Sequence, residues 1–139
     1  MKKTFSFDAG HSICTAIYKN KVFTGEAHCH PEDADFESER VGLYIAEVRT
    51  DINILTYIRD CELKPAYNAL NHIQHSFKRS SHYNPNSYEA KHIRKQLRVI
   101  ENQLTVVSNE LATLKSTLTA YIKDKDAFYQ RIRKGRNKQ

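Results

Sequence analysis

The side chains best suited to bind a ligand gather between His72 and Arg98. They combine aromatic rings that can stack on a base, amides that can hydrogen-bond a base edge, and cations that can hold phosphates. This combination predicts a nucleotide site. The alternative is a solvated basic loop whose aromatic rings only pack. The members of the set are His72, His75, Phe77, Lys78, Arg79, His82, Tyr83, Asn84, Asn86, Tyr88, Lys91, His92, Arg94, Lys95 and Arg98.

A smaller group within this set is expected to form the site itself. A base would stack on the ring of Phe77, Tyr83 or Tyr88. Phosphate groups would be held by the arginines through charge-assisted hydrogen bonds. We expect no cofactor. The predicted ligand-binding residues are Phe77, Arg79, His82, Tyr83, Asn84, Asn86, Tyr88, Arg94 and Arg98.

A metal site is suggested by the run His28-Cys29-His30, with His11 and Cys14 earlier in the chain. Structural zinc needs four ligands that converge tetrahedrally. In a strand, His28 and His30 share one face while Cys29 points to the other, so three adjacent ligands cannot converge. We therefore expect no metal, and we expect Cys29 to be a small core residue.

Nucleophilic catalysis needs a Cys or Ser held by a base and an orienting group. Asp8, His11 and Cys14 are one such combination, but short polar segments often supply one by chance. The chain has no glycine-rich phosphate loop and no nucleophile elbow. We expect no catalytic residues and a protein that is not an enzyme. A group of carboxylates is expected to mark a helix start rather than an acid–base pair: Glu32, Asp33, Asp35, Glu37 and Glu39.

Three short alternating segments open the chain and predict strands at Lys3–Asp8, Ser12–Tyr18 and Val22–His30. Ala9-Gly10 is a turn signal, and Lys19-Asn20-Lys21 suits a tight connection because Asn tolerates positive φ. The three strands would form an antiparallel meander. One face of such a sheet is shielded from water only if another element packs against it. We expect the helix that follows to do so.

That helix is predicted from about Phe36 to Leu63. Lys64-Pro65 should interrupt it, because the residue before proline avoids the α region. Pro65 can also start a new helix, predicted to run to about Lys78, with a kink as the alternative to a full break. The apolar stripe of the first helix is Val41, Ile45, Val48, Ile52 and Leu55.

A loop at Arg79–Ser87 should precede the longest helix, with Asn86 and Glu89 as a cap-like start. Tyr88–Arg133 contains neither proline nor glycine, and about 45 residues of helix reach roughly 70 Å. Its apolar residues alternate four and three apart, which is the seam of a coiled coil. The seam residues are Ile93, Leu97, Ile100, Leu104, Val107, Leu111, Leu114, Leu118 and Tyr121.

These elements predict an α+β fold: a small N-terminal antiparallel three-stranded sheet, then long C-terminal helices in a coiled-coil-like antiparallel pair. We expect a single domain with a β-meander at 1–33, a helical segment at 34–83 that bends at Pro65, a long C-terminal helix at 86–134 and a basic tail at 135–139. The longest helix outreaches its intrachain partners. We therefore expect homo-oligomers, either a dimer or an assembly of dimers.

The formal net charge of +6 favours an anionic partner without identifying it. The three cysteines, Cys14, Cys29 and Cys61, are widely spaced and odd in number, which suggests reduced thiols. No apolar run approaches the roughly 20 residues that span a bilayer. We expect no membrane partner and a location in the bacterial cytoplasm.

Between Val22 and Arg49, small and polar residues recur in a specific pattern. They are Gly25, Ala27, Cys29, Pro31, Asp33, Phe36, Gly42, Ala46 and Arg49. The pattern resembles a segment of small bacteriophage proteins that include the first family of Thoeris anti-defence proteins. That family is a sponge for cyclic nucleotide signals made by bacterial immune enzymes. The segment from Asp33 to Gly42 is slightly longer here than in the usual pattern.

The resemblance implies a phage-encoded, nucleotide-binding anti-defence protein. It would sequester a cyclic ADP-ribose isomer, or a cyclic oligonucleotide, in the infected host without degrading it. In that family, ligand pockets lie in the helical part near subunit contacts. The alternative is a coiled-coil phage protein that binds nucleic acid or a host protein, which the seam and the basic tail favour.

Overall fold

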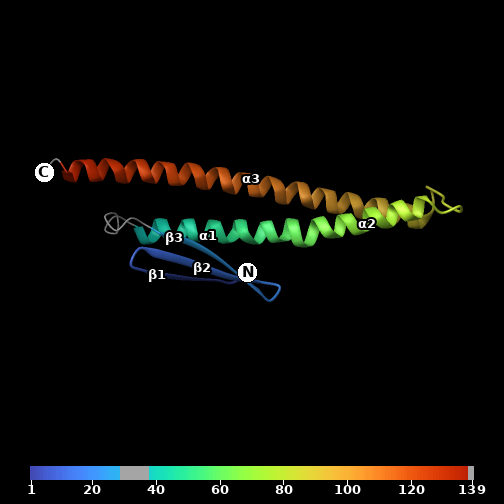
Figure 1. Ribbon diagram of the computed structural model, residues 1–139, viewed down its shortest axis with the longest axis horizontal. Coiled ribbons are helices and arrows are strands. Elements are labelled where there is room, and N and C mark those ends of the chain that lie inside the picture. The colour runs from blue at the N-terminus through green and yellow to red at the C-terminus, as the bar shows by residue number, and fades with distance from the viewer. Residues whose placement is uncertain (29–37, 138–139) are drawn as a thin grey trace. The chain divides into compact units, whose positions relative to one another are not determined.

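The computed structural model describes residues 1–28 and 38–137 of the chain and confirms the α+β class. Two compact units make up the fold. Unit 1 comprises Met1–Ile54 and Ala112–Gln139, and unit 2 comprises Leu55–Leu111. The elements in chain order are β1 (Lys3–Asp8), β2 (His11–Tyr18), β3 (Lys21–His28), α1 (Ser38–Tyr57), the π-helical segment η2 (Ile58–Leu63), α2 (Lys64–Lys78) and α3 (Tyr88–Asn137) (Figure 1).

The strands form one antiparallel sheet in the order β1-β2-β3, as predicted. Each hairpin closes through two residues with positive φ: Ala9 (50°) and Gly10 (80°), then Lys19 (48°) and Asn20 (64°). Two-residue turns of this kind match the right-handed twist of the strands that they join. The second turn pairs Tyr18 with Lys21 and thereby sets the register of β2 against β3. The predicted last residues of the third strand lie outside the described residues.

One face of the sheet packs against α1 through very small residues. A Cβ atom on Gly25 would collide with the backbone oxygen of Ala46 and lie 2.5 Å from the backbone nitrogen of Thr50. A Cβ atom on Gly42 would likewise collide with the hydroxyl of Ser12. The strand-to-helix spacing is therefore set by glycine. The small residues Gly42 and Ala46, one turn apart on α1, thus let the helix lie close to the sheet.

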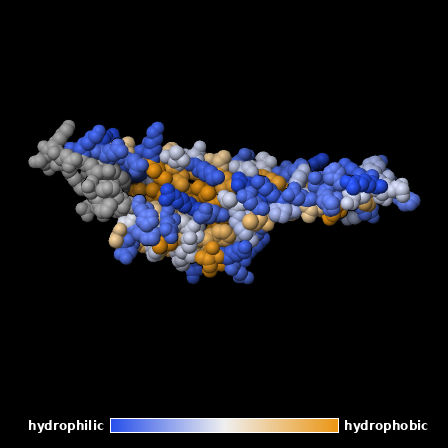
Figure 2. All heavy atoms as spheres, in the orientation of Figure 1, coloured by the Kyte–Doolittle hydropathy of each residue, from blue (hydrophilic) through white to orange (hydrophobic). Residues whose placement is uncertain are grey.

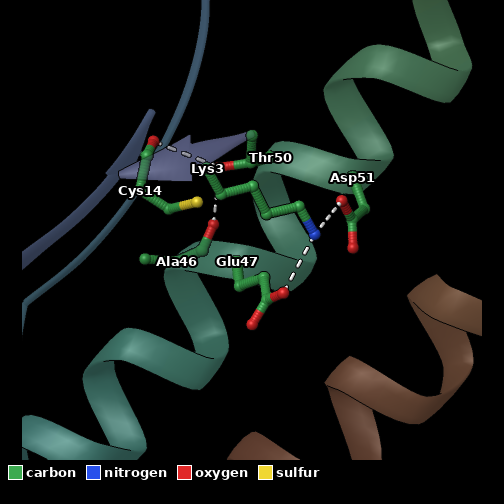
Figure 3. A network of polar contacts seen from close by, with 6 residues as sticks. All are labelled: Lys3, Cys14, Ala46, Glu47, Thr50 and Asp51. Carbon is green, nitrogen blue, oxygen red and sulfur yellow. Dashed lines mark hydrogen bonds and ion pairs between the residues drawn. The ribbon is translucent and has the colours of Figure 1, made fainter. Parts of the chain in front are cut away.

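Polar contacts reinforce the same interface (Figure 3). The hydroxyl of Thr50 lies 2.8 Å from the carbonyl oxygen of Ala46 and 3.2 Å from that of Cys14 on β2. It is buried and has acceptors in both the helix and the sheet. Because a buried hydroxyl without a partner is costly, these acceptors explain how a polar side chain occupies this position.

Lys3 on β1 adds an ion-pair network at the edge of the interface. Its Nζ lies 2.9 Å from Glu47 Oε1 and 2.9 Å from Asp51 Oδ1, one turn apart on α1 (Figure 3). Partial burial alone would lower the pKa of Lys3. The hydrogen bonds to Asp51 and Glu47 outweigh that effect and raise the pKa above its ordinary value. The network therefore ties the edge strand β1 to the helix.

The predicted change of helix at Pro65 lies where η2 meets α2. α2 begins at Lys64, one residue before Pro65, and ends at the predicted Lys78, with η2 leading directly into it. The clash that proline makes with the carbonyl four residues earlier is avoided by a π-helical turn, η2, directly before α2. The backbone N–H of Lys64 donates to the carbonyl oxygen of Arg59, five residues earlier. A π-helical turn is wider than an α-helical turn, so η2 leads into α2 without an intervening loop.

An exposed ion-pair network lies on the same π-helical turn. Arg59 Nε lies 2.8 Å from Asp60 Oδ1, and Lys64 Nζ lies 3.2 Å from the same oxygen. The hydrogen bond from Arg59, followed by that from Lys64, lowers the pKa of Asp60 from 3.8 to about 2. Because the group is exposed, water and salt screen the pair, and its contribution to stability is small.

The pKa of Asp60, measured in solution, tests whether this ion-pair network forms. A lowered pKa means that the pairing favours the folded chain above pH 3.8 and loses its effect as the pH falls through about 2. We expect an NMR titration of the Asp60 carboxyl to show a midpoint near pH 2. In Arg59→Ala the midpoint should move back toward 3.8. A wild-type midpoint already at the ordinary value would show that the pairing does not persist in solution.

The seam predicted for α3 is confirmed by the burial along the helix. Every seam residue from Ile93 to Tyr121 is buried or half-buried, whereas most positions between them are exposed. In unit 2, Tyr67 on α2 donates a hydrogen bond of 3.1 Å to Glu101 on α3. In unit 1, the rings of Tyr44 on α1 and Tyr121 on α3 lie 4.6 Å apart. α3 continues past the predicted end, through Gly135 to Asn137.

Among the described residues, no helix combines the length and the apolar character needed to cross a bilayer.

Candidate functional site

The loop between α2 and α3 is ordered by two consecutive turns. In the first, the N–H of Tyr83 donates to the carbonyl oxygen of Ser80 at 3.1 Å. In the second, the N–H of Ser87 donates to the carbonyl oxygen of Asn84 at 3.1 Å. The side-chain oxygen of Asn84 also accepts from the N–H of Asn86 at 2.9 Å, which is an Asx turn. The loop therefore has a defined backbone that can present side chains in fixed positions.

Ser87, and not Asn86 as predicted, caps α3. Its hydroxyl accepts a hydrogen bond of 3.2 Å from the N–H of Ala90, three residues along. Arg94, two turns into the helix, donates from its guanidinium to the carbonyl oxygen of Pro85 at 2.7 Å. This charge-assisted bond holds the loop against the helix. Asn84 and Arg94, both predicted to bind ligand, thus also stabilise the loop.

The aromatic residues of the predicted site form two groups. Phe77 at the end of α2 packs edge to face with Tyr83 of the loop, with ring centroids 5.4 Å apart and an interplanar angle of 86°. Tyr88 at the start of α3 stacks on His92, with centroids 5.9 Å apart and an angle of 12°. Phe77 and Tyr83 are half-buried, but Tyr88 is 78% exposed. Tyr88 is therefore the ring with the most free surface for stacking on a base.

Arg79, Arg94, Arg98 and His82 all occupy exposed positions. Arg79 follows the last residue of α2, and Arg98 lies one turn beyond Arg94 on α3. Arg98 is about 15 Å along the helix from Tyr88, given 1.5 Å per residue. Within residues 1–28 and 38–137, no hydrogen bond or ion pair engages the side chains of Arg79, His82 or Arg98. The surface over the loop is mostly hydrophilic (Figure 2).

The structure brings some of the predicted residues together and leaves others apart. Phe77 meets Tyr83, and Asn84 meets Asn86. Among the described residues, no hydrogen bond, ion pair or ring contact joins Arg79 or Arg98 to these groups. The surface offers the exposed ring of Tyr88 and two guanidinium groups that no polar group of the described residues engages.

The combination of Asp8, His11 and Cys14 does not converge. Cys14 is fully buried on the face of the sheet that packs against α1, where no substrate can reach its thiol. Neighbouring strand residues alternate in direction, so His11 lies on the opposite face. Cys29 and His30, weighed earlier as metal ligands, lie outside the described residues.

One cluster of chemically active side chains was missed by the sequence analysis. His11 and His28 are paired across β2 and β3, and Glu26 lies two residues before His28 on the same face. The signal was available in the sequence. The two-residue turn at Lys19-Asn20 fixes which residues of β2 and β3 face each other, and counting back from it pairs His11 with His28.

Comparisons of the chain with family models, with curated proteins and with solved structures find no match.

Proposed function

We propose that this chain is a non-enzymatic phage protein that binds a cyclic nucleotide immune signal and holds it without degrading it. The ligand is a cyclic ADP-ribose isomer made by a TIR-domain enzyme, or a cyclic oligonucleotide, in the cytoplasm of the infected host. The observation that carries the proposal is the ordered loop of unit 2 with its exposed Tyr88 ring and, at the end of α2 and on α3, two arginines that no polar group of the described residues engages. The resemblance of the Val22–Arg49 segment to the Thoeris anti-defence family supports it.

Each part of the loop has a role in this proposal. Tyr88 stacks on a base, since its ring is 78% exposed and already oriented by His92. Arg79 and Arg98 bind the phosphates through charge-assisted hydrogen bonds. The turns around Asn84 and the bond from Arg94 to Pro85 hold the backbone in place before the ligand arrives. A preordered site loses less entropy on binding.

A protein that retains its nucleotide without degrading it must also release that nucleotide slowly. A sponge must release its ligand slowly, and slow release comes from several strong contacts in a desolvated pocket. An exposed loop of one chain does not desolvate a ligand by itself. We propose that chains assemble as homo-oligomers, a dimer or an assembly of dimers, and that the loop region of one chain meets a neighbouring chain around the ligand.

The proposal is tested by offering the full chain a purified cyclic ADP-ribose isomer and recording native mass spectra. We expect an oligomer that retains the nucleotide, and we expect heating to return the nucleotide chemically intact. Arg79→Ala and Arg98→Ala should each weaken binding about tenfold, as expected for loss of a hydrogen bond to a charged group. Lys115→Ala, which removes an exposed cation elsewhere on α3, is the matched control and should bind normally.

Three outcomes would overturn the proposal. A nucleotide that is released in altered form would make the chain an enzyme. If the chain retains neither the ADP-ribose isomer nor a cyclic oligonucleotide, the proposed sequestering function is excluded. Tight binding to duplex DNA that weakens steeply between two salt concentrations, without nucleotide retention, would favour the nucleic-acid-binding alternative.

A further inference from the structure

The outer face of the sheet in unit 1, opposite the face that α1 covers, carries a compact cluster of His11, Glu26 and His28. The imidazole rings of His11 and His28 stack with centroids 4.1 Å apart and an interplanar angle of 12°. The Nε2 atom of His11 lies 3.3 Å from Glu26 Oε2, and that of His28 lies 3.9 Å from the same oxygen. One potential ligand atom from each residue lies within 4.8 Å of the other two.

The positions of these residues follow from the backbone. His11 and His28 face each other across the β2–β3 ladder, so their side chains leave the sheet together. Glu26 shares their face because side chains alternate along β3. Asp8 lies directly across from His11 in the β1–β2 register and adds a carboxylate to the same row. Each of the three strands thus contributes a polar residue to one end of the sheet.

One of the three distances already matches that between neighbouring ligands of one metal ion. Zinc binds imidazole nitrogen at about 2.0–2.1 Å and carboxylate oxygen at about 2.0–2.2 Å, so neighbouring ligand atoms of a tetrahedral site lie roughly 3.3–3.5 Å apart. The contact between His11 and Glu26 already has this length at 3.3 Å. The side chain of His28 is 70% exposed and can rotate to shorten its 3.9 Å contact.

We propose that His11, Glu26 and His28 bind a divalent transition-metal ion of the Zn²⁺ class. Two imidazoles and one carboxylate favour such an ion over Mg²⁺ or Ca²⁺, which prefer ligand sets made only of oxygen. Three protein ligands leave the fourth tetrahedral position to water. The ion joins β2 to β3 and binds only the folded sheet, so it stabilises unit 1. This site is separate from the nucleotide-binding loop of unit 2.

The proposal is tested by calorimetric titration of the full chain with zinc chloride alone. We expect a tight site that His28→Gln and Glu26→Gln each weaken at least about tenfold, since each loses a direct ligand. His75→Ala removes an exposed histidine on α2 and is the matched control, with unchanged binding. In NMR spectra, the ring signals of His11 and His28 should shift on zinc addition, whereas that of His75 should not.

His28→Gln and Glu26→Gln both change exposed side chains, so we expect both variants to fold. Circular dichroism of each variant checks that it has the secondary structure of the wild type. The exposed thiol of Cys61 is a competing ligand, but it is the same in the wild type and in the variants. Zinc affinity that is equal in the wild type and in His28→Gln would overturn the proposal. So would ring signals of His11 and His28 that do not respond to zinc. Either result would reduce the cluster to an ordinary His–Glu ion pair.

Discussion

Replacing Gly25 with alanine is expected to destabilise unit 1 by about 3 kcal/mol, at the upper end for overpacking a well-packed interface. The added Cβ would meet backbone atoms of α1, namely the carbonyl oxygen of Ala46 and the nitrogen of Thr50. Backbone atoms cannot rotate away as a flexible side chain can. The helix must therefore move off the sheet, which also stretches the contact between Thr50 and Cys14.

The measurement is urea unfolding followed by circular dichroism, with wild type and variant at the same protein concentration because assembly would contribute to stability. Gly135→Ala is the matched control. A Cβ there meets nothing within 4 Å, and alanine favours a helix over glycine. The control should be neutral or slightly stabilised. If Gly25→Ala is as stable as Gly135→Ala, the helix does not lie against the sheet as closely as described.

Replacing Leu111 with alanine is expected to cost about 2–5 kcal/mol, the range for deleting a fully buried leucine side chain. Leu111 is 2% exposed and is the largest side chain in the fully buried class. Alanine at this position loses the transfer energy of the removed methyl and methylene groups and leaves a cavity. Unfolding in urea should show a lower midpoint with a similar slope.

The matched control for Leu111→Ala is Val106→Ala, five residues earlier on the same helix. Val106 is 56% exposed, so its truncation should change stability by less than about 0.5 kcal/mol. The pair separates burial from helix propensity, since both variants place alanine in α3. Equal effects from the two variants would mean that the seam of α3 is not the buried face in solution.

Local patterns were sufficient to predict most of the elements. The alternation of Lys3–Asp8, the turn residues Lys19 and Asn20, and the four-three spacing of the α3 seam depend on neighbours in the chain. The helix boundary at Pro65 was predicted within one residue, since α2 begins at Lys64, but the π-helical turn before it was not predicted. In that turn the N–H of Lys64 donates to the carbonyl oxygen of Arg59, five residues earlier.

The candidate site could be predicted only in part. The composition of the loop indicated aromatic and basic residues, and the loop lies where it was expected. The sequence did not predict which of these residues stabilise the loop through hydrogen bonds to its own backbone. The bond from Arg94 to Pro85 joins residues nine apart, and Pro85 is placed by the turn that Asn84 and Ser87 close. Residue type alone does not distinguish an arginine that binds a ligand from one that binds a carbonyl oxygen.

By itself the sequence determined where strands, turns and helices form and which face of each is apolar, because these properties depend on residues a few positions apart. Only the tertiary structure decided that Gly25 lies directly beneath Ala46 and Thr50. It also decided which face of the sheet α1 covers, and so left His11, Glu26 and His28 on the uncovered face. The physical reason is the same in both cases. Contacts between distant segments depend on register and on the distance of closest approach, and both are set when whole elements pack.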